Sequence, residues 1–538
     1  MKICYYTDMK QQSHTLTLLV SGKSFTLENT LPRSVREALH DLGLEGVSFP
    51  CGGHGVCGKC LVRQISGPIP NPNEHDYHHL SEDQLKAGFR LGCTLQIPCN
   101  ENVTLVLGDA EQNEHVLTTY LEDQKADLFI SGKCGVAIDV GTTTIVVYLV
   151  DRASATVLGT LAAMNHQRTY GGDVIARIQY ASETEGGVSL LHTTLVSQLC
   201  NMIQTLLQEH SLSTKSVDEV VVVGNPTMMH FLSKEDPASL AVAPFTPVFV
   251  KPKILEGTLF RLEQAKVLVP GLVSAYIGSD ITVGLHASNV LDEQKGVLYI
   301  DIGTNGEIAL YNGKELFSCS SAAGPAFEGA SILHGMSALG GAIDHVWLSE
   351  DGSIAFSTIG EEKAKGICGS GIIDCVALML GLHLIDETGA INGEHPEYAR
   401  YMQDGPALRL TDTVVFTARD IREVQLAKAA IAAGVQVLLE EAGMTLSDVH
   451  TLYLAGGFGS FIHTQQAQQI GLLPLVSEQS IRTVGNAAGK GALCILTQSK
   501  GWQDVETIRR SMHYHELSSS AAFQNHFIDQ MLFAGEGL

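Results

Sequence analysis

The first hundred residues alternate apolar and polar positions in short runs, which predicts strands more than long helices. TLTLLV (15–20) and SFTLE (24–28) flank a short polar turn and predict a β-hairpin. SVREALHDLG (34–43) spaces its apolar residues for one short helix that ends at a glycine. The strand-like runs CLVRQISG, RLGCTLQIP and NVTLVLG then complete a small β-grasp-like domain over residues 1–108. The polar stretch 109–132 lacks sustained periodicity and is interpreted as a linker.

From residue 133 onward, apolar strands alternate with helical segments, which is typical of an α/β fold. Two hairpins of the same design contain IDVGTTT and IDIGTNGE, and their aspartates, Asp139 and Asp301, stand 162 residues apart. DIREVQLAKAAIAAGVQVLLEEAG (420–443) has strong helical spacing and a glycine stop. The repeated hairpin predicts an internally duplicated domain with subdomains 133–295 and 296–538.

Charge and cysteine usage narrow the class of protein. The 538 residues include 34 basic and 58 acidic side chains, a net charge of −24, and no basic stripe, which argues against nucleic acid or an anionic membrane as partner. We expect no membrane span and no signal peptide, because no window of 18 uncharged apolar residues and no apolar N-terminal segment occurs. Most of the twelve cysteines lie singly in apolar runs, which indicates a reduced, cytoplasmic protein without a disulfide framework.

Four cysteines form a separate group in a glycine-rich region. In CGGHGVCGKC, Cys51, Cys57 and Cys60 are spaced C-x5-C-x2-C, and Cys93 follows after 32 further residues. Glycines between the cysteines let the backbone approach an iron–sulfur cluster and donate N–H groups to its sulfurs. The competing interpretations are a structural zinc site, which usually presents two separated C-x2-C knuckles, and unliganded thiols, which would be exposed to oxidation.

This region resembles a 2Fe–2S ferredoxin domain over roughly residues 14–108, in the spacing variant similar to adrenodoxin. The resemblance makes Cys51, Cys57, Cys60 and Cys93 the four iron ligands. Cys99 is the competing fourth ligand, but the RLGC sequence with a strand behind it favours Cys93. His54 lies inside the loop, where we expect it to pack at the surface and not to bind iron.

The paired hairpins predict a nucleotide site. An aspartate at a strand end followed by Gly-Thr places a carboxylate beside turn N–H groups that bind phosphate oxygens, while the carboxylate orients Mg²⁺. One such turn is an ordinary β-turn, but two, followed by the glycine-rich LAGGFGS at 454–460, favour ATP with its adenosine against the backbone. No P-loop sequence occurs. The alternative is a pair of ordinary hairpins in a duplicated scaffold.

The three loops together resemble the superfamily of actin, sugar kinases and the large heat-shock ATPases, with duplicated ribonuclease-H-like sheets. The resemblance implies a first phosphate loop formed by Asp139, Gly141, Thr142 and Thr143. It implies a second phosphate loop formed by Asp301, Gly303, Thr304, Asn305 and Gly306. It implies an adenosine loop formed by Gly456, Gly457 and Gly459. It further implies that Asp139 and Asp301 hold Mg²⁺ through water, and that one of them, or Glu307, positions the attacking water.

Other glycine-rich loops point to the same cleft. GNPTMMH places Asn225 at a strand end, and SAAGPAFEGA offers Gly324 and Glu328 at a predicted helix start. GICGSGIID, with Cys368, is a further turn before a helix. Each of these loops is alternatively a tight turn or helix cap.

The combination of both halves is similar to the reductive activators of corrinoid proteins, and the match extends over nearly the whole chain, including VVVGNPTMMHFL and SCSSAAGPAFEGA. The resemblance implies an ATP-hydrolysing enzyme that passes one electron from a 2Fe–2S cluster to Co(II), restoring Co(I) in a methyltransferase system. It also implies a corrinoid methyl-carrier protein as partner, an upstream low-potential electron donor, Mg²⁺ with the ATP, and a possible homodimer.

Three alternative functions remain open at this point. An ATP-dependent activator of a radical dehydratase would hold a 4Fe–4S cluster through cysteines of its ATPase domain, but these cysteines form no obvious set here. A small-molecule kinase with a regulatory redox domain would transfer phosphate to a metabolite. A redox sensor would bind ATP without appreciable hydrolysis.

Overall fold

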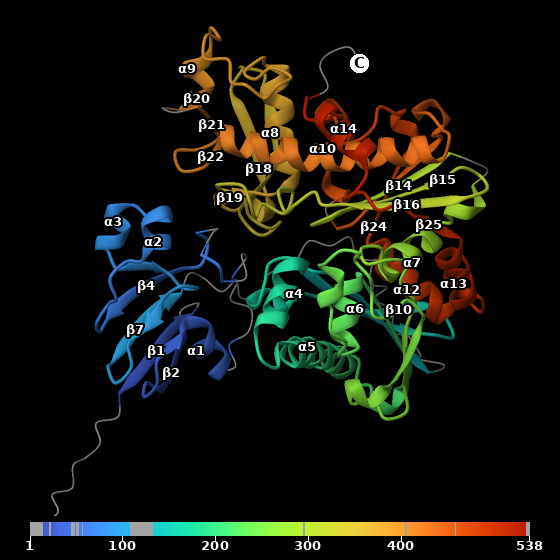
Figure 1. Cartoon of the computed structure of the whole chain (residues 1–538), viewed down its shortest axis with the longest axis horizontal. Coiled ribbons are helices and arrows are strands. Elements are labelled where there is room, and N and C mark those ends of the chain that lie inside the picture. Colours follow the sequence, from blue (N-terminus) through green and yellow to red (C-terminus); the bar gives the residue numbers. More distant parts are fainter. Residues whose placement is uncertain are drawn as a thin grey trace, which may run out of the picture. The chain divides into compact units, whose positions relative to one another are not determined.

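The computed structural model describes residues 14–20, 23–42, 44, 49, 53–55, 58–107, 133–293, 296–403, 406–457 and 459–533. Contacts divide these residues into two compact units (Figure 1). The first contains the described residues up to 107 together with His166–Tyr180, and the second contains the remainder. None of the described helices has both the length and the apolar character needed to cross a bilayer.

The N-terminal unit is built on a mixed five-stranded sheet in the order β2-β1-β7-β4-β5. Its strands are β1 (Thr15–Val20), β2 (Lys23–Glu28), β4 (Leu61–Ser66), β5 (Phe89–Leu91) and β7 (Val103–Leu107). β1 pairs antiparallel with β2, as the hairpin pattern predicts, and parallel with β7. Alternate residues of β1, such as Leu16 and Leu18, are fully buried against α1 (Val35–Asp41), and β3 (Arg33–Ser34) pairs with β6 (Gln96–Ile97).

The polar insert of this unit forms two short helices, α2 (Glu74–His79) and α3 (Glu82–Lys86), which the sequence analysis did not predict. Each begins with a capping box, in which Asn73 or Ser81 and the residue three positions later satisfy each other's backbone N–H groups. The buried Asp76 also accepts a hydrogen bond from Leu91 N (2.8 Å), which ties α2 to β5.

The first sheet of the second unit has the order β10-β9-β8-β11-β13-β12. Its strands are β8 (Cys134–Val140), β9 (Thr144–Asp151), β10 (Thr156–Met164), β11 (Val217–Gly224), β12 (Lys253–Glu256) and β13 (Lys266–Val269). In the sequence between these strands come α4 (Val174–Glu183), most of which belongs to the first unit, α5 (Gly187–Glu209) and α6 (Pro226–Leu232), and α7 (Ser279–Ala287) follows β13.

The second sheet has the order β24-β23-β14-β15-β16-β25. Its strands are β14 (Val297–Ile302), β15 (Gly306–Tyr311), β16 (Leu316–Ser321), β23 (Thr451–Ala455), β24 (Ile481–Gly485) and β25 (Met512–Tyr514). The long helix α10 (Ala418–Glu441) lies across this sheet, with α14 (Ala521–Asp529) beside it (Figure 1). The helical spacing of 420–443 therefore predicts α10 to within two residues at each end.

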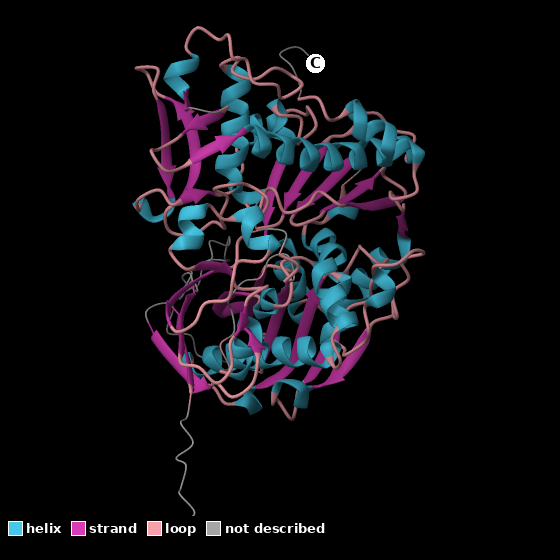
Figure 2. Ribbon diagram, turned by 60° about the vertical axis from the view of Figure 1, so that its left-hand side comes forward, coloured by secondary structure: helices cyan, strands magenta, loops and turns pink. Residues whose placement is uncertain are grey.

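The two sheets repeat one topology, which confirms the predicted duplication (Figure 2). In each, the first three strands form an antiparallel meander and the next two join parallel to the first, giving β10-β9-β8-β11-β13 and β16-β15-β14-β23-β24. This arrangement is the ribonuclease-H-like order expected of the fold class. Because both aspartates end the central first strand of their sheet, the duplication places Asp139 and Asp301 in equivalent positions.

The helix α12 (Ala487–Thr497) crosses back from the second sheet to the first. Its residues share a core with β8 and β9, including Ala137, Tyr148 and Leu493. A second core, which contains Ile281 of α7 and Tyr299 of β14, also includes Ala487 and Ile508 of α13 (Gly501–Ser511). The two sheets thus share α7, α12 and α13 between them.

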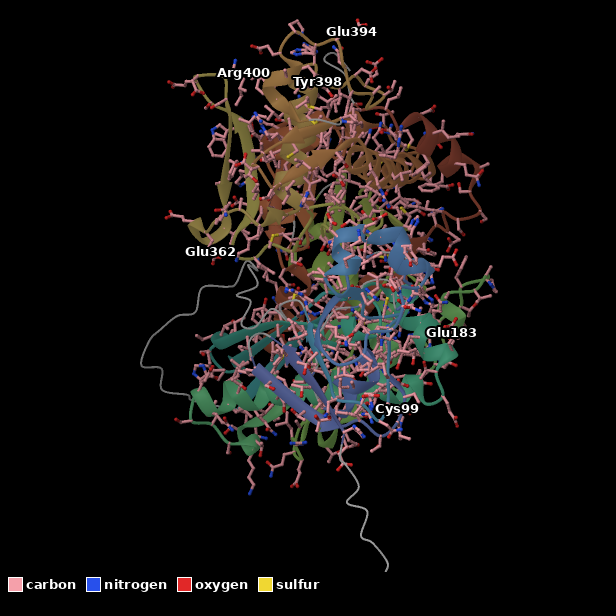
Figure 3. The ribbon with its side chains drawn as sticks, turned by 90° about the vertical axis from the view of Figure 1, so that its left-hand side faces the viewer. Cys99, Glu183, Glu362, Glu394, Tyr398 and Arg400 are labelled. Atoms are coloured by element: carbon pink, nitrogen blue, oxygen red, sulfur yellow. The ribbon has the colours of Figure 1, made fainter. Side chains whose placement is uncertain are left out.

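A smaller layer extends from the second sheet. β17 (Ala342–Leu348), β18 (Ile354–Thr358) and β19 (Gly366–Ile367) form one three-stranded sheet, followed by α8 (Gly369–Gly381). β20 (Met402–Gln403), β21 (Ala407–Arg409) and β22 (Val415–Thr417) form another, after α9 (Tyr398–Tyr401). Arg400 of α9, labelled in Figure 3, donates to Asp351 O (2.8 Å) and holds the two sheets together. α11 (Thr464–Gln469) packs on α8.

Candidate functional site

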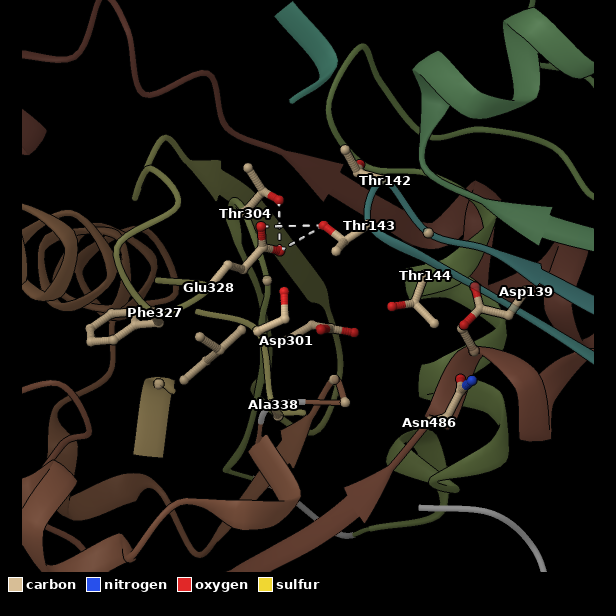
Figure 4. A pocket seen from close by; sticks show the side chains of 18 of the residues that line it. Asp139, Thr142, Thr143, Thr144, Asp301, Thr304, Phe327, Glu328, Ala338 and Asn486 are labelled. Atoms are coloured by element: carbon tan, nitrogen blue, oxygen red, sulfur yellow. Dashed lines mark hydrogen bonds between the residues drawn. The ribbon is translucent and has the colours of Figure 1, made fainter. Parts of the chain in front are cut away.

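A cavity of about 290 Å³ opens between the hairpin turns of the second unit (Figure 4). Both predicted phosphate loops and the glycine-rich loop after β23 contribute to its wall. The predicted residues that line it are Asp139, Gly141, Thr142, Thr143, Asp301, Gly303, Thr304, Asn305, Glu307, Glu328, Gly456 and Gly457. Asn225 and Cys368, whose loops the sequence analysis placed at the same cleft, line it as well.

The first phosphate loop is the tight turn between β8 and β9. Gly141 N donates to Thr144 O (2.9 Å), and a Cβ at position 141 would lie 2.6 Å from that oxygen. Only glycine therefore allows the turn to close. Asn225, the N-cap of α6, donates from Nδ2 to Thr142 Oγ1 (2.9 Å) and fixes the loop from the next strand.

The predicted second phosphate loop lies at the equivalent place, between β14 and β15, but closes one residue earlier. Gly303 N donates to Asn305 O (2.9 Å), and Asp301 and Glu307 face each other across the hairpin register. The two carboxylates therefore stand side by side at the mouth of the turn.

Glu328 joins the two loops. Its carboxylate accepts hydrogen bonds from Thr304 Oγ1 (2.8 Å) and from Thr143 Oγ1 (3.3 Å to each oxygen), drawn as dashed lines in Figure 4. Glu328 lies in a loop after β16 and not at a helix start, so that expectation for 321–330 is wrong. Gly324 has φ +74°, which forces a turn there and prevents a regular helix.

Four buried carboxyl groups crowd this cavity. Burial, reinforced by the charge of Asp280, raises the pKa of Asp139 to about 7 and that of Asp301 to about 7. Burial raises the pKa of Asp280 to about 6 and raises that of Glu307 well above its usual range. Acidic groups held this close without a cation repel one another, so the donor set fits Mg²⁺, which takes oxygen ligands and neutralises their charge.

Two residues of this centre were missed by sequence reasoning. Asp280 stands in the first turn of α7, and its signal was an acidic residue directly after Gly278 and Ser279 at a helix start. Asn486 caps α12 by accepting from Gly489 N (2.7 Å), and its amide also hydrogen-bonds Asp139, which partly lowers the pKa of that carboxyl. The sequence signal for Asn486 was the run NAAGKG, but this run is equally typical of an ordinary helix cap.

The loop after β23 approaches the second aspartate closely. Gly456 has φ +90°, and a Cβ there would lie 2.6 Å from Asp301 Oδ1. Three predicted glycines do not line the cavity: Gly306, Gly324 and Gly459. Gly306 instead faces α10, where a Cβ would lie 2.6 Å from Ile431 Cγ1, and Gly459 faces Leu454 of β23. Packing, not ligand contact, therefore accounts for Gly306 and Gly459.

In the N-terminal unit, the strand register brings two predicted iron ligands together. β4 and β5 pair Leu61 with Leu91, and Gly92 N donates to Cys60 O (2.6 Å), so Cys60, just before β4, and Cys93, two residues after β5, lie at the adjoining ends of neighbouring strands. Cys60 is buried and Cys93 is partly buried. Cys51 and Cys57 lie outside the described residues. Cys99, labelled in Figure 3, follows β6, which pairs with β3 instead of β4.

The glycines of the cysteine loop fit an iron–sulfur cluster. Gly53, Gly55 and Gly58 all have positive φ, at +98°, +71° and +68°. Such a backbone turns its N–H groups inward, where they can donate to cluster sulfurs. α2 packs on this loop: His79 Nε2 is hydrogen-bonded with Gly55 O (3.0 Å), and His75 lies where a Cβ of Gly55 would be. His54 is exposed, as expected.

Comparison with known proteins finds related proteins for both the N-terminal unit and the second unit. Residues 18–98 match the family model of the 2Fe-2S iron-sulfur cluster binding domain, 134–293 the RACo middle region, and 295–538 the C-terminal domain of RACo, the ASKHA domain. The chain is 35% identical over 419 residues to the corrinoid activation enzyme RamQ of Eubacterium limosum, covering 74% of this chain and 70% of that protein. It is 24% identical over 443 residues to a [Co(II) methylated amine-specific corrinoid protein] reductase of Methanosarcina barkeri, covering 75% and 78%.

A solved structure extends the similarity to nearly the full length. The reductive activator for corrinoid, iron-sulfur protein aligns with a TM-score of 0.68 and 29% identity, over 97% of this chain and 98% of that one.

The duplicated sheets, the two equivalent Asp-x-Gly-Thr turns and the ferredoxin-type unit define an iron–sulfur protein fused to an ATPase of the actin and sugar-kinase class. The 2Fe–2S cluster, ATP and Mg²⁺ are its cofactors. Within that class, the chain belongs to the RACo family of corrinoid activation enzymes.

Proposed function

We propose that this protein is an ATP-dependent reductive activator of a corrinoid protein, returning inactive Co(II) to Co(I) by transfer of one electron. The observation that carries the proposal is the presence, in one chain of the RACo family, of a ferredoxin-type cysteine loop and a carboxylate-lined cavity between two phosphate loops. The partner is a corrinoid methyl-carrier protein of a methyltransferase system.

At the nucleotide, this chain's residues divide into three tasks. Backbone N–H groups and the hydroxyls of Thr143 and Thr304 bind phosphate oxygens once Glu328 releases them. Asp139 and Asp301 hold Mg²⁺ through water. Glu307, beside Asp301 in the hairpin register, positions the attacking water and accepts its proton, for which its raised pKa suits it.

At the other unit, Cys51, Cys57, Cys60 and Cys93 hold the 2Fe–2S cluster. When bound, the cluster supplies one-electron chemistry at low potential, near roughly −400 mV for plant-type ferredoxins. The residues around it set that potential through burial of Cys60 and through N–H groups of the positive-φ glycines.

ATP is needed because a corrinoid Co(II) is more difficult to reduce than the cluster. Each ~59 mV uphill costs about tenfold in a one-electron equilibrium. A nucleotide helps only if the ATP-bound protein binds one cobalt form better than the other. We propose that the two phosphate loops close on ATP, and that this conformational change makes the protein prefer one cobalt form over the other.

Three further features belong to the proposal. An upstream low-potential donor reduces the cluster, the protein acts in the cytoplasm, and two copies pair through the ATPase unit.

The test is anaerobic absorbance of a Co(II) corrinoid methyl-carrier protein mixed with this protein and a reductant, with and without Mg-ATP. We expect a Co(I) band that needs ATP, is abolished by Asp301→Asn, and is abolished by Cys60→Ser. Cys99→Ser is the matched control, since Cys99 lies in the same unit away from β4, and it retains activity.

Absence of Co(I) with several carriers, despite an intact cluster and bound ATP, would reject the proposal. Phosphate transfer to a metabolite would then indicate the kinase, and binding without hydrolysis the sensor.

A further inference from the structure

Three metal-ligating side chains meet outside the nucleotide cavity. His345 comes from β17, Asp374 from the middle of α8, and His463 from the position just before α11. None of the three lines the cavity. The three elements are far apart in the sequence, so their convergence is a product of the fold.

The ligand atoms are arranged around a common point. His345 Nδ1 lies 3.1 Å from Asp374 Oδ2, and His463 Nδ1 lies 3.3 Å from Asp374 Oδ1. One nitrogen of each ring and one carboxylate oxygen all lie within 4.8 Å of one another. The two imidazole rings stack with their centroids 3.9 Å apart, and both Nδ1 atoms are hydrogen-bonded to the same carboxylate.

These spacings match those of a metal ion's ligands. Zinc binds histidine nitrogen and carboxylate oxygen at about 2.0–2.2 Å, so neighbouring ligand atoms of a tetrahedral site stand about 3.3 Å apart. Each Nδ1 already stands about that far from one of the two oxygens of Asp374. With one ligand atom taken from each residue, all separations are within 4.8 Å, and an ion would draw the wider pair together.

The surroundings also suit a bound ion. Asp374 is buried, with its side chain 1% exposed, and Val346 N donates to its Oδ2 (3.2 Å), which fixes the carboxylate. His463 is 48% exposed on the other side, so solvent can supply the remaining ligand. A buried anchor with an open outer face is typical of sites with two histidines and one carboxylate.

We propose that His345, Asp374 and His463 bind a divalent transition-metal ion, for which Zn²⁺ is the probe. Each ring binds the ion through Nδ1 as the neutral tautomer that carries its one proton on Nε2, so metal at Nδ1 takes the place of the proton shared with the carboxylate and no imidazolate forms.

The position of this site gives the ion a structural consequence. α8 begins at Gly369 and Ser370, which line the nucleotide cavity, and His463 follows Phe461, which lines it too. A metal bridge from α8 to His463 therefore clamps the end of the adenosine loop onto α8. The ion stabilises the closed arrangement of that loop without touching the nucleotide.

The experiment uses the full chain with its cluster loaded and its iron content measured, so that the cluster cysteines do not take up zinc. The buffer contains millimolar Mg²⁺, so that the ATP site does not take up zinc either. Zinc is titrated against a chromophoric chelator, and bound metal is counted by mass spectrometry. The variants are His463→Gln and His345→Gln. His526→Gln is the matched control, because His526 also meets one carboxylate, Glu440 (2.9 Å), but no second histidine.

We expect one zinc ion per chain in the wild-type protein and in the control, and a loss of affinity of about 100-fold in each of the two site variants. The melting temperature should rise with zinc in the wild-type protein and not in His463→Gln. Absence of zinc binding at micromolar free zinc, or equal binding by His463→Gln, would overturn the proposal and leave the three residues as a hydrogen-bonded structural group. Co(I) formation is not part of this readout, so the result stands apart from the proposed activity.

Discussion

Asp280 shows how a single side chain can organise the chemistry of its neighbours. Its carboxyl is buried in the first turn of α7, and its charge raises the pKa of Asp139, Asp301 and Glu307. Four such groups lower one another's acidity unless a cation is present. We therefore expect Asp280 to contribute to Mg²⁺ affinity although it belongs to neither predicted phosphate loop.

Replacing Asp280 by Asn should raise the Mg²⁺ concentration needed for half-maximal ATP hydrolysis by about tenfold or more, because one of the four negative charges is lost. The measurement is ATPase rate against Mg²⁺ at saturating ATP. Asp292→Asn, an acidic residue two turns beyond α7 that does not line the cavity, serves as control. An unchanged Mg²⁺ requirement in Asp280→Asn would show that this charge plays no part in the site.

Lys428 gives a pH-dependent prediction at the same scale. It is fully buried on α10, donates to Leu532 O, and lies 5.6 Å from the ring centre of Phe533. Burial lowers the pKa of Lys428 to about 8 from its usual value of 10.5. Between those values the unfolded chain holds the proton and the folded chain has lost it, so stability rises with pH there.

Lys428→Met removes this dependence. We expect the difference in unfolding free energy between Lys428→Met and wild type to change by up to about 3 kcal/mol between pH 7.5 and 10, with the wild type gaining. Denaturant unfolding at a series of pH values measures it. A difference that stays constant with pH would mean that Lys428 keeps its ordinary pKa in the fold.

At the level of elements, regular patterns were predictable and irregular contacts were not. Strand alternation, the spacing of 420–443 and the repeated Asp-x-Gly-Thr turns identify the sheets, α10 and both phosphate loops. The sequence did not predict that Asp280 and Asn486 line the cavity, because their positions depend on where α7 and α12 pack. That packing is decided by contacts between residues distant in the sequence. The loop with Glu328 was mispredicted for a local reason. The sequence around Gly324 favoured a helix start, but the left-handed backbone of Gly324 makes a turn.

The unpredicted helix α2 yields a test of its own. His79 is hydrogen-bonded with Gly55 O and packs where a Cβ of Gly58 would be. Removing the ring in His79→Ala should cost about 1 kcal/mol of loop stability. We therefore expect severalfold faster loss of cluster absorbance on exposure to an iron chelator.

Tyr77→Ala is the matched control for that experiment, because Tyr77 lies on the same helix with 66% of its surface exposed. If both variants lose their clusters at the wild-type rate, α2 does not protect the cysteine loop.

At the scale of the whole molecule, the two sheets of the ATPase unit are joined through crossing helices. α7 and α12 approach so closely that a Cβ at Gly491 would lie 2.2 Å from Val283 O. Ile281 and Ala487 sit in a core that also takes residues from the second sheet. If the two phosphate loops move relative to each other, as proposed above, we expect this crossing to absorb the movement.

Gly491→Ala should force the helices apart and destabilise the unit by about 1–3 kcal/mol. A lower unfolding midpoint, with weaker ATP binding in the same variant, is the expected result. Gly393→Ala provides the comparison, since nothing lies within 4 Å of a Cβ there. An unchanged midpoint for Gly491→Ala would contradict the close crossing.

The return of α12 to the first sheet also matters while the chain is being made. Tyr148 and Ala137, near the start of the ATPase unit, are covered by Leu493 and Ala492, near its end. As the ribosome synthesises the chain from the N-terminus, the first sheet emerges with an uncovered apolar face and waits for almost all of the remaining residues. The ferredoxin unit has no such requirement within its own sheet and can fold at once. We therefore expect the nascent chain of this protein to keep an apolar face of its first sheet uncovered until synthesis is nearly finished.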